Sequence, residues 1–141
     1  MHVGKNDIDA LFVGSFLVEL AEEQGLMISE FSERFNFKVP IFRSEAACAS
    51  GSQAFLTACL AIKSGLFKIV VVVGAEKMTD RYSDMTELLA TACSSWESLY
   101  GATFPSIYGL IASKHMLDYG TTREQLSLVA VKNHQHALNN K

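Results

Sequence analysis

The sequence has few charged residues, few prolines and few cysteines. Charged residues make up 19% of the 141 positions, and the formal net charge is −3. A typical soluble domain has about a quarter. No cluster of lysine and arginine stands out, so the chain lacks the electrostatic pattern of a nucleic-acid-binding protein. The three cysteines form no C-x-x-C pair, which argues against a disulfide framework and against a thiolate zinc site.

Long hydrophobic runs are also absent. The longest wholly aliphatic run covers residues 69–73, which is far too short to span a bilayer. The first residues, MHVGKND, lack the apolar segment of a signal peptide. We therefore predict a cytoplasmic chain that binds no metal and contacts neither nucleic acid nor membrane.

What is present is an alternation of strand and helix patterns. Residues 8–14, 41–46 and 68–74 have the composition of strands. The β-branched run in the last of these is typical of a strand covered on both faces, in a parallel or mixed sheet. Residues 19–35 favour either one helix or two short helices broken near Gly25, and residues 50–64 favour a helix. The alternation predicts an α/β fold.

The second half of the chain has a different pattern. Residues 81–103 are polar and irregular, as in a functional loop or lid. Two helices are then expected. The first, over residues 105–119, has Pro105 in its first turn and Gly120 at its end. A capping box over residues 121–124 opens the second, which continues to about residue 139.

The residues most suggestive of chemistry are 45–54, EAACASGSQA, which begin a run of seventeen uncharged residues between Glu45 and Lys63. A helix that is apolar on every side is expected to be buried on every side. Cys48 falls at the junction of strand and helix, where backbone N–H groups and the positive end of the helix dipole favour a thiolate. The same N–H groups are able to stabilise an oxyanion. The alternative is that Cys48 is an ordinary buried small residue.

Several segments together resemble the thiolase family, in the archaeal and sterol-carrier-protein-like branch of its acetyl-CoA acetyltransferases. They are EAACASGSQA (45–54), VVVVGAEKMTD (70–80), GATFP (101–105), TTREQL (121–126) and VAVKNH (129–134). The resemblance implies that Cys48 is the catalytic nucleophile and accepts an acyl group from acyl-CoA as a thioester. A cysteine supplies the good sulfur nucleophile that exchange between thioesters requires.

The resemblance also implies an architecture and partners. The fold expected is the partial N-terminal half of a thiolase, a mixed sheet with a buried nucleophile helix. Residues 1–80 correspond to the core domain, and residues 81–141 to the loop or cap region of the same domain. The substrates implied are two short acyl-CoA molecules, with no cofactor beyond CoA, and the full-length form is expected to be a homodimer or homotetramer.

Other family motifs are missing from this sequence. Thiolases carry the activating histidine and a second acid/base cysteine in their C-terminal half, and no Gly-His-Pro motif or late Cys-x-Gly motif occurs here. The resemblance therefore implies an N-terminal fragment of about a third of a thiolase, inactive on its own. The substrate-binding residues stay unassigned.

The remaining titratable side chains receive structural interpretations. Cys59 is expected to be core packing and Cys93 an unreactive loop thiol. His134 and His136 lie roughly 200° apart around a helix and do not form a metal-binding pair. Neither His115 nor His134 is expected to be the base.

Four further side chains have both a structural and a functional interpretation. Glu76 ends a buried strand, where it either supports the active site or, as we favour, pairs with Lys77 or a loop. Three cationic side chains are expected to be solvated rather than bound to CoA phosphates: Lys114, Arg123 and Lys132.

Two other functions remain compatible with these residues. One is another condensing enzyme of the thiolase superfamily, a 3-ketoacyl synthase or a hydroxymethylglutaryl-CoA synthase. The other is a non-catalytic thiolase-like protein that binds acyl-CoA or lipid, or serves as a scaffold. The segment over residues 73–80 favours the thiolase branch.

Overall fold

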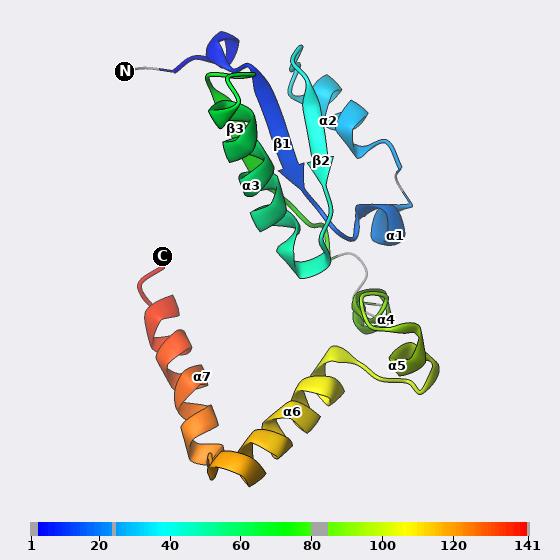
Figure 1. The fold of residues 1–141 in the computed structure, drawn as a ribbon, viewed down its shortest axis with the longest axis vertical. Helices are drawn as coiled ribbons and strands as arrows, with labels where there is room; N and C mark the ends of the chain where they lie inside the picture. Colours follow the sequence, from blue (N-terminus) through cyan, green and yellow to red (C-terminus); the bar gives the residue numbers. More distant parts are fainter. Residues whose placement is uncertain (1–2, 24, 80–84, 141) are drawn as a thin grey trace. The chain divides into compact units, whose positions relative to one another are not determined.

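A computed structural model describes residues 3–23, 25–79 and 85–140 of the chain (Figure 1). The chain divides into two compact units, Met1–Ala92 and Cys93–Lys141. The boundary that we predict, between a core over 1–80 and a cap over 81–141, lies outside the described residues.

The first unit contains a three-stranded parallel sheet with the order β2-β1-β3. Its strands are β1 (Ala10–Gly14), β2 (Ile41–Ser44) and β3 (Val70–Gly74). At the start of β3, the backbone N–H groups of Lys68 and Ile69 donate to Asp9 Oδ2 at 2.7 and 2.9 Å. Both hydrogen bonds lower the pKa of the Asp9 carboxyl group, and the one from Ile69 has the larger effect. The predicted α/β class is confirmed.

The described residues of this unit also form four α-helices and two short 3-10 helices. The α-helices are α1 (Val18–Glu22), α2 (Met27–Arg34), α3 (Ser50–Lys63) and α4 (Met85–Ala90), and the 3-10 helices cover Lys5–Asp7 and Ala47–Ala49. The helical pattern over residues 19–35 therefore forms two short helices, which is the second of the two alternatives left open by the sequence.

The two faces of the sheet are covered by different helices (Figure 1). On one face, Ala10 and Phe12 of β1 pack against Ala54 and Ala58 of α3. On the other face, Leu11 and Val13 pack with Met27 of α2, and Val18 of α1 joins them. Every residue of β1 is buried, because this central strand has a neighbour on each side and a helical layer on each face.

Two burial predictions are wrong within the described part of the chain. We expect β3 to be covered on both faces, but it forms an edge of the sheet, and Val72 is 36% exposed. We also expect α3 to be buried on every side. Only the face with Ser50, Ala54 and Ala58 is buried, and Phe55 on its outer surface is 62% exposed.

The second unit is helical. It contains α5 (Ser95–Leu99), α6 (Phe104–Tyr119) and α7 (Arg123–Ala137). Residues 85–90 and 95–99 thus form the short helices α4 and α5 inside a segment that we expect to be irregular. Pro105 lies in the first turn of α6, and Gly120 ends it with φ +68°, both as predicted.

The capping box of α7 lies one residue later than predicted. The Thr122 hydroxyl accepts from the Gln125 N–H, and the Gln125 side chain accepts from the Thr122 N–H. Thr121 instead contacts His115, with 2.8 Å between Thr121 Oγ1 and His115 Nδ1. Among residues 3–23, 25–79 and 85–140, no helix has the length and apolar character needed to cross a membrane.

Candidate active site

A pocket of about 370 Å³ lies at the carboxyl ends of β1 and β3, beside the first turn of α3. In parallel α/β sheets this edge is where ligands bind. The residues that line the pocket are Gly14, Phe16, Leu17, Ala47, Cys48, Ser50, Gly51, Gly74, Ala75, Glu76, Met78 and Leu89.

Cys48 lies in this pocket, in the 3-10 turn Ala47–Ala49 that leads directly into α3. Its position at the junction of strand and helix is as predicted. Cys48 is exposed, whereas Cys59 and Cys93 are partly buried. The alternative interpretation of Cys48 as an ordinary buried residue is therefore wrong for this chain.

Side chains on both sides of Cys48 fix the turn that carries it. Ala47 has φ +47°, a left-handed conformation that is uncommon for a residue with a Cβ. The Ala47 N–H donates to Glu45 Oε1 at 2.5 Å. The Ser50 hydroxyl accepts from the Ala46 N–H at 2.9 Å and donates to the Ala47 carbonyl at 2.7 Å. These contacts hold the backbone in a conformation that a free chain seldom adopts.

Three backbone N–H groups around Cys48 already have acceptors. The Ala47 N–H binds Glu45, the Ala49 N–H binds the Ala46 carbonyl, and the Ser50 N–H binds the Ala47 carbonyl. These three N–H groups stabilise the turn itself. The stabilisation of an oxyanion at this junction stays a prediction, and it concerns backbone N–H groups other than these three.

Gly14, at the end of β1, allows the nucleophile turn to approach the sheet. A methyl group at Gly14 would lie 2.5 Å from the Ser50 carbonyl oxygen and 2.7 Å from the Gly51 Cα and backbone nitrogen. Contacts below 3.0 Å force the backbone to shift, so any larger residue at position 14 displaces the start of α3. Sequence reasoning identifies Gly14 only as the end of a strand, because it does not show which element crosses there.

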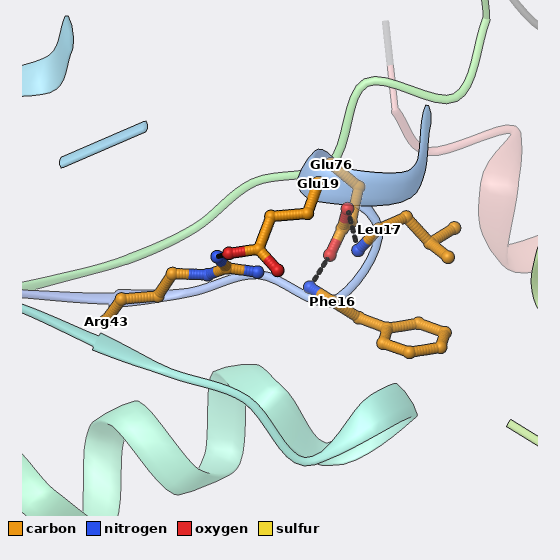
Figure 2. Close-up of polar contacts among 5 residues, drawn as sticks. All are labelled: Phe16, Leu17, Glu19, Arg43 and Glu76. Atoms are coloured by element: carbon orange, nitrogen blue, oxygen red, sulfur yellow. Dashed lines mark hydrogen bonds and ion pairs between the residues drawn. The ribbon is translucent and has the colours of Figure 1, made fainter. Parts of the chain in front are cut away.

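Glu76 joins the two loops that wall the pocket. Figure 2 shows its carboxylate beside the first residues after β1: Oε1 accepts from the Phe16 N–H, and Oε2 accepts from the Leu17 N–H at 3.1 Å. Glu76 thus contacts a loop and also lines the Cys48 pocket, so its support of the active site stays a prediction. The sequence gives no sign that this loop is the one after β1, because 60 and 59 positions separate the partners.

An ion pair lies close to this contact. Arg43 Nη1 of β2 is 2.5 Å from Glu19 Oε1 of α1 (Figure 2). Two polar atoms in this part of the sheet, Arg43 Nε and the hydroxyl of the buried Ser15, have no hydrogen-bond partner among the described residues. None of the three side chains lines the Cys48 pocket.

The other candidate residues have local contacts within the second unit. His115 Nδ1 contacts Thr121, and His134 Nδ1 donates to the Ala130 carbonyl at 2.8 Å. Lys114 forms an ion pair with Asp118 at 2.5 Å. The part of the chain that the structure describes holds no group of three or more residues able to ligate a metal ion.

Comparison with known proteins connects this geometry to a family. The family described as "Thiolase, N-terminal domain" matches residues 1–141. The chain belongs to the thiolase family. Its sequence is 44% identical over 136 residues to acetyl-CoA acetyltransferase of Methanothermobacter thermautotrophicus, a match that covers 95% of the chain and 35% of that protein. The corresponding enzyme of Methanocaldococcus jannaschii is 40% identical, with 96% and 35% covered.

The thiolase-family chain is also similar to sterol carrier protein 2 of Rattus norvegicus. The identity is 31% over 111 residues, which cover 72% of the chain and 20% of that protein. The chain thus spans about a third of the length of the archaeal relatives. The resemblance found in the sequence, and the branch of thiolases it indicates, are confirmed.

Proposed function

We propose that this chain supplies the acyl-accepting part of a thiolase, an acetyl-CoA C-acyltransferase, with Cys48 as its nucleophile. The observation that carries the proposal is an exposed cysteine in a fixed turn at the start of α3, inside a pocket at the carboxyl ends of β1 and β3. The chain's similarity to acetyl-CoA acetyltransferases supports CoA thioesters as the substrates.

The step proposed for this chain is acyl transfer to sulfur. Cys48 Sγ attacks the carbonyl carbon of an acyl-CoA, a new carbon–sulfur bond forms, and the bond from that carbon to the CoA sulfur breaks. The proton of the Cys48 thiol passes to the departing CoA thiolate, so the products are an acyl-Cys48 thioester and CoA. Sulfur serves as both nucleophile and leaving group, so the exchange is nearly balanced in energy.

The second half of the reaction needs groups from outside these 141 residues. A Claisen condensation requires a base that removes a proton next to a second thioester. Thiolases carry the activating histidine and the second acid/base cysteine in their C-terminal half. We therefore propose that this chain accepts one acyl group and does not turn over.

Further parts of the proposal concern the chain's surroundings. We propose a homodimer or homotetramer as the full-length form, location in the cytoplasm, a role in lipid metabolism, and no cofactor beyond CoA. The exposed apolar residues on the outer surface of α3, which include Phe55 and Leu60, support burial of this helix against further protein. An apolar surface of this kind is a common mark of an interface.

The test is acylation of the 141-residue chain by acetyl-CoA, followed by peptide mass spectrometry. We expect one acetyl group per chain, on the peptide that contains Cys48, and no formation of acetoacetyl-CoA. Cys48→Ser should abolish the label, because a serine hydroxyl is a far weaker nucleophile at neutral pH.

Cys93→Ser is the matched control and should keep the full label. A label on Cys93 alone, or no label on the wild-type chain, would contradict the proposal. The absence of a label would favour a non-catalytic thiolase-like protein.

A further inference from the structure

The pocket around Cys48 has two walls that come from distant parts of the sequence. Phe16 and Leu17 follow β1, whereas Ala75, Glu76 and Met78 follow β3. Contacts between these two segments therefore set the spacing of the walls. The Ala75 N–H donates to the Gly14 carbonyl at 3.3 Å. Beyond this backbone contact, the two carboxylate oxygens of Glu76 accept from the N–H groups of Phe16 and Leu17 (Figure 2).

The chemistry of this contact requires a carboxylate. Two backbone donors face one side chain, and an ionised carboxylate has acceptor oxygens at both positions. A glutamine of the same size has one acceptor oxygen and one NH₂ group, so one of the two N–H groups would then face a donor. Leu17 is only 2% exposed, and a backbone N–H in such a place is normally paired with an acceptor.

The position of these N–H groups gives the contact a second effect. Leu17 is the residue that precedes α1, and it has no side-chain cap of its own. The N–H groups at the start of a helix have no partner within the helix, so the segment before α1 depends on an acceptor from elsewhere. Glu76 is that acceptor, and it ties the path of the loop after β1 to the end of β3.

The walls fixed in this way are mostly apolar. Phe16, Leu17, Met78 and Leu89 line the pocket beside Cys48, and apolar side chains of this kind suit an acyl chain better than the phosphates of CoA. A shift of the Phe16–Leu17 segment thus changes the space next to the sulfur.

We propose that Glu76 is a positioning residue that holds the Phe16–Leu17 segment as one wall of the Cys48 pocket and so sets the size of the acyl group that Cys48 accepts. This inference rests on the proposed function, because it assigns the pocket to the acyl part of a CoA thioester. Glu76 itself forms no bond with the reacting atoms.

The neighbouring ion pair supplies a matched control. Glu19, like Glu76, is a glutamate that contacts another element near α1, and its partner is Arg43 at 2.5 Å (Figure 2). Neither Glu19 nor Arg43 lines the Cys48 pocket. Glu19→Gln therefore removes one negative charge from the same region and leaves the pocket wall in place.

The experiment compares Glu76→Gln with Glu19→Gln in the 141-residue chain. Amide hydrogen exchange reads the two N–H groups directly: we expect about threefold to tenfold faster exchange at Phe16 and Leu17 in Glu76→Gln, the factor that corresponds to loss of one hydrogen bond. The rates of Cys48 acylation by acetyl-CoA and by octanoyl-CoA are then measured. We expect their ratio to change about threefold or more in Glu76→Gln and to stay at the wild-type value in Glu19→Gln.

A second variant and a second reagent keep the test decisive. If circular dichroism shows that Glu76→Gln is unfolded, Glu76→Asp replaces it, since this side chain keeps both acceptors and is too short to reach both donors. If the wild-type chain accepts no acyl group, the proposed function fails. The ratio of Cys48 alkylation rates by iodoacetamide and by a bulky maleimide then reports the pocket wall.

The outcomes separate a positioning role from a structural one. Unchanged exchange at Phe16 and Leu17, or unchanged rate ratios in the Glu76 variant, would overturn the inference. Equal changes in the Glu76 and Glu19 variants would overturn it as well, because they would show a general loss of stability. Changes confined to the Glu76 variant support it.

Discussion

The two units of this chain form regular structure by different means. In Met1–Ala92, β1 is wholly buried, and its side chains pack on helices on both faces. In Cys93–Lys141, none of the described residues is buried, and Leu117 of α6 is 81% exposed. The helices of the second unit begin and end at local signals, such as the Thr103 and Thr122 caps and Gly120.

This difference shows which part of the molecule depends on tertiary contacts. Packing of an apolar face usually supplies most of the stability of helices in proteins, because isolated helices are marginal in water. In the first unit that packing is present, and it fixes the nucleophile turn. In the second unit, the helix caps at Thr103, Thr122 and Gly120 are the main stabilising features of the described residues.

The largest effect is expected from Phe12→Ala in the first unit. Phe12 is 2% exposed. Its ring stacks on that of Phe42, with 5.0 Å between the ring centroids, and packs edge to face with that of Phe67, with 6.4 Å between the centroids. Removing a buried phenylalanine ring should lower the free energy of unfolding by about 3–5 kcal/mol. Urea unfolding, with amide hydrogen exchange to resolve the two units, measures the loss.

Tyr108→Ala in α6 is the control for this truncation. Tyr108 is 63% exposed, so its loss should change the free energy of unfolding by no more than about 0.5 kcal/mol. Equal losses from the two substitutions would remove the contrast between the units.

A smaller effect is expected from Gly14→Ala, which introduces a methyl group 2.5 Å from the Ser50 carbonyl oxygen. Overpacking of this kind should destabilise the first unit by about 1–3 kcal/mol. It should also alter the alkylation rate of Cys48 by iodoacetamide, because the turn Ala47–Ala49 must move with α3. Gly74→Ala is the matched control for the change in the free energy of unfolding.

Gly74 pairs with Gly14 in the sheet register, and a methyl group there would meet no atom within 4 Å among its non-local neighbours. We expect Gly74→Ala to leave the free energy of unfolding nearly unchanged. A loss in Gly74→Ala as large as that in Gly14→Ala would show that the close approach of α3 to β1 is not the cause.

The smallest effect is expected from Thr122→Ala in the second unit. Loss of this helix cap should cost about 1 kcal/mol locally, and amide exchange in the first turn of α7 should become about fivefold faster. Exchange in β1 and alkylation of Cys48 should stay at wild-type values, since the cap hydrogen bond that this substitution removes joins Thr122 and Gln125.

Thr121→Ala tests the register of the same cap. The sequence pattern favours Thr121, but the contact that the structure assigns to its hydroxyl is with His115. Exchange in α7 should therefore be unchanged in Thr121→Ala. If exchange in α7 were faster in Thr121→Ala than in Thr122→Ala, the cap would be Thr121 and not Thr122.

Much of the fold is predictable because its signals are local. The strands follow runs of apolar residues, and α6 follows Pro105 and Gly120. The position of Cys48 at the junction of strand and helix is predictable for a related reason, because a short segment of small residues between the two marks the junction in the sequence itself. The α7 cap lies one residue later than the sequence predicts, because adjacent threonines offer nearly the same pattern.

The remaining features depend on residues far apart in the chain. Gly14 matters because the first turn of α3 crosses β1 there, and Glu76 matters because its carboxylate meets Phe16 and Leu17. The exposure of Val72 could not be predicted either, since a β-branched run is the same whether its strand is central or at an edge. Each of these requires the topology of the sheet, which no local pattern contains.

The left-handed backbone at Ala47 limits how the sequence of this turn can diverge. Glycine adopts this conformation without a steric cost, asparagine and aspartate tolerate it, and β-branched residues are strongly disfavoured there. A related chain with valine, isoleucine or threonine at the position before the cysteine would need a different turn. The type of residue just before the cysteine therefore indicates, in an alignment of related sequences, which of them keep the same turn and the same position of the cysteine sulfur.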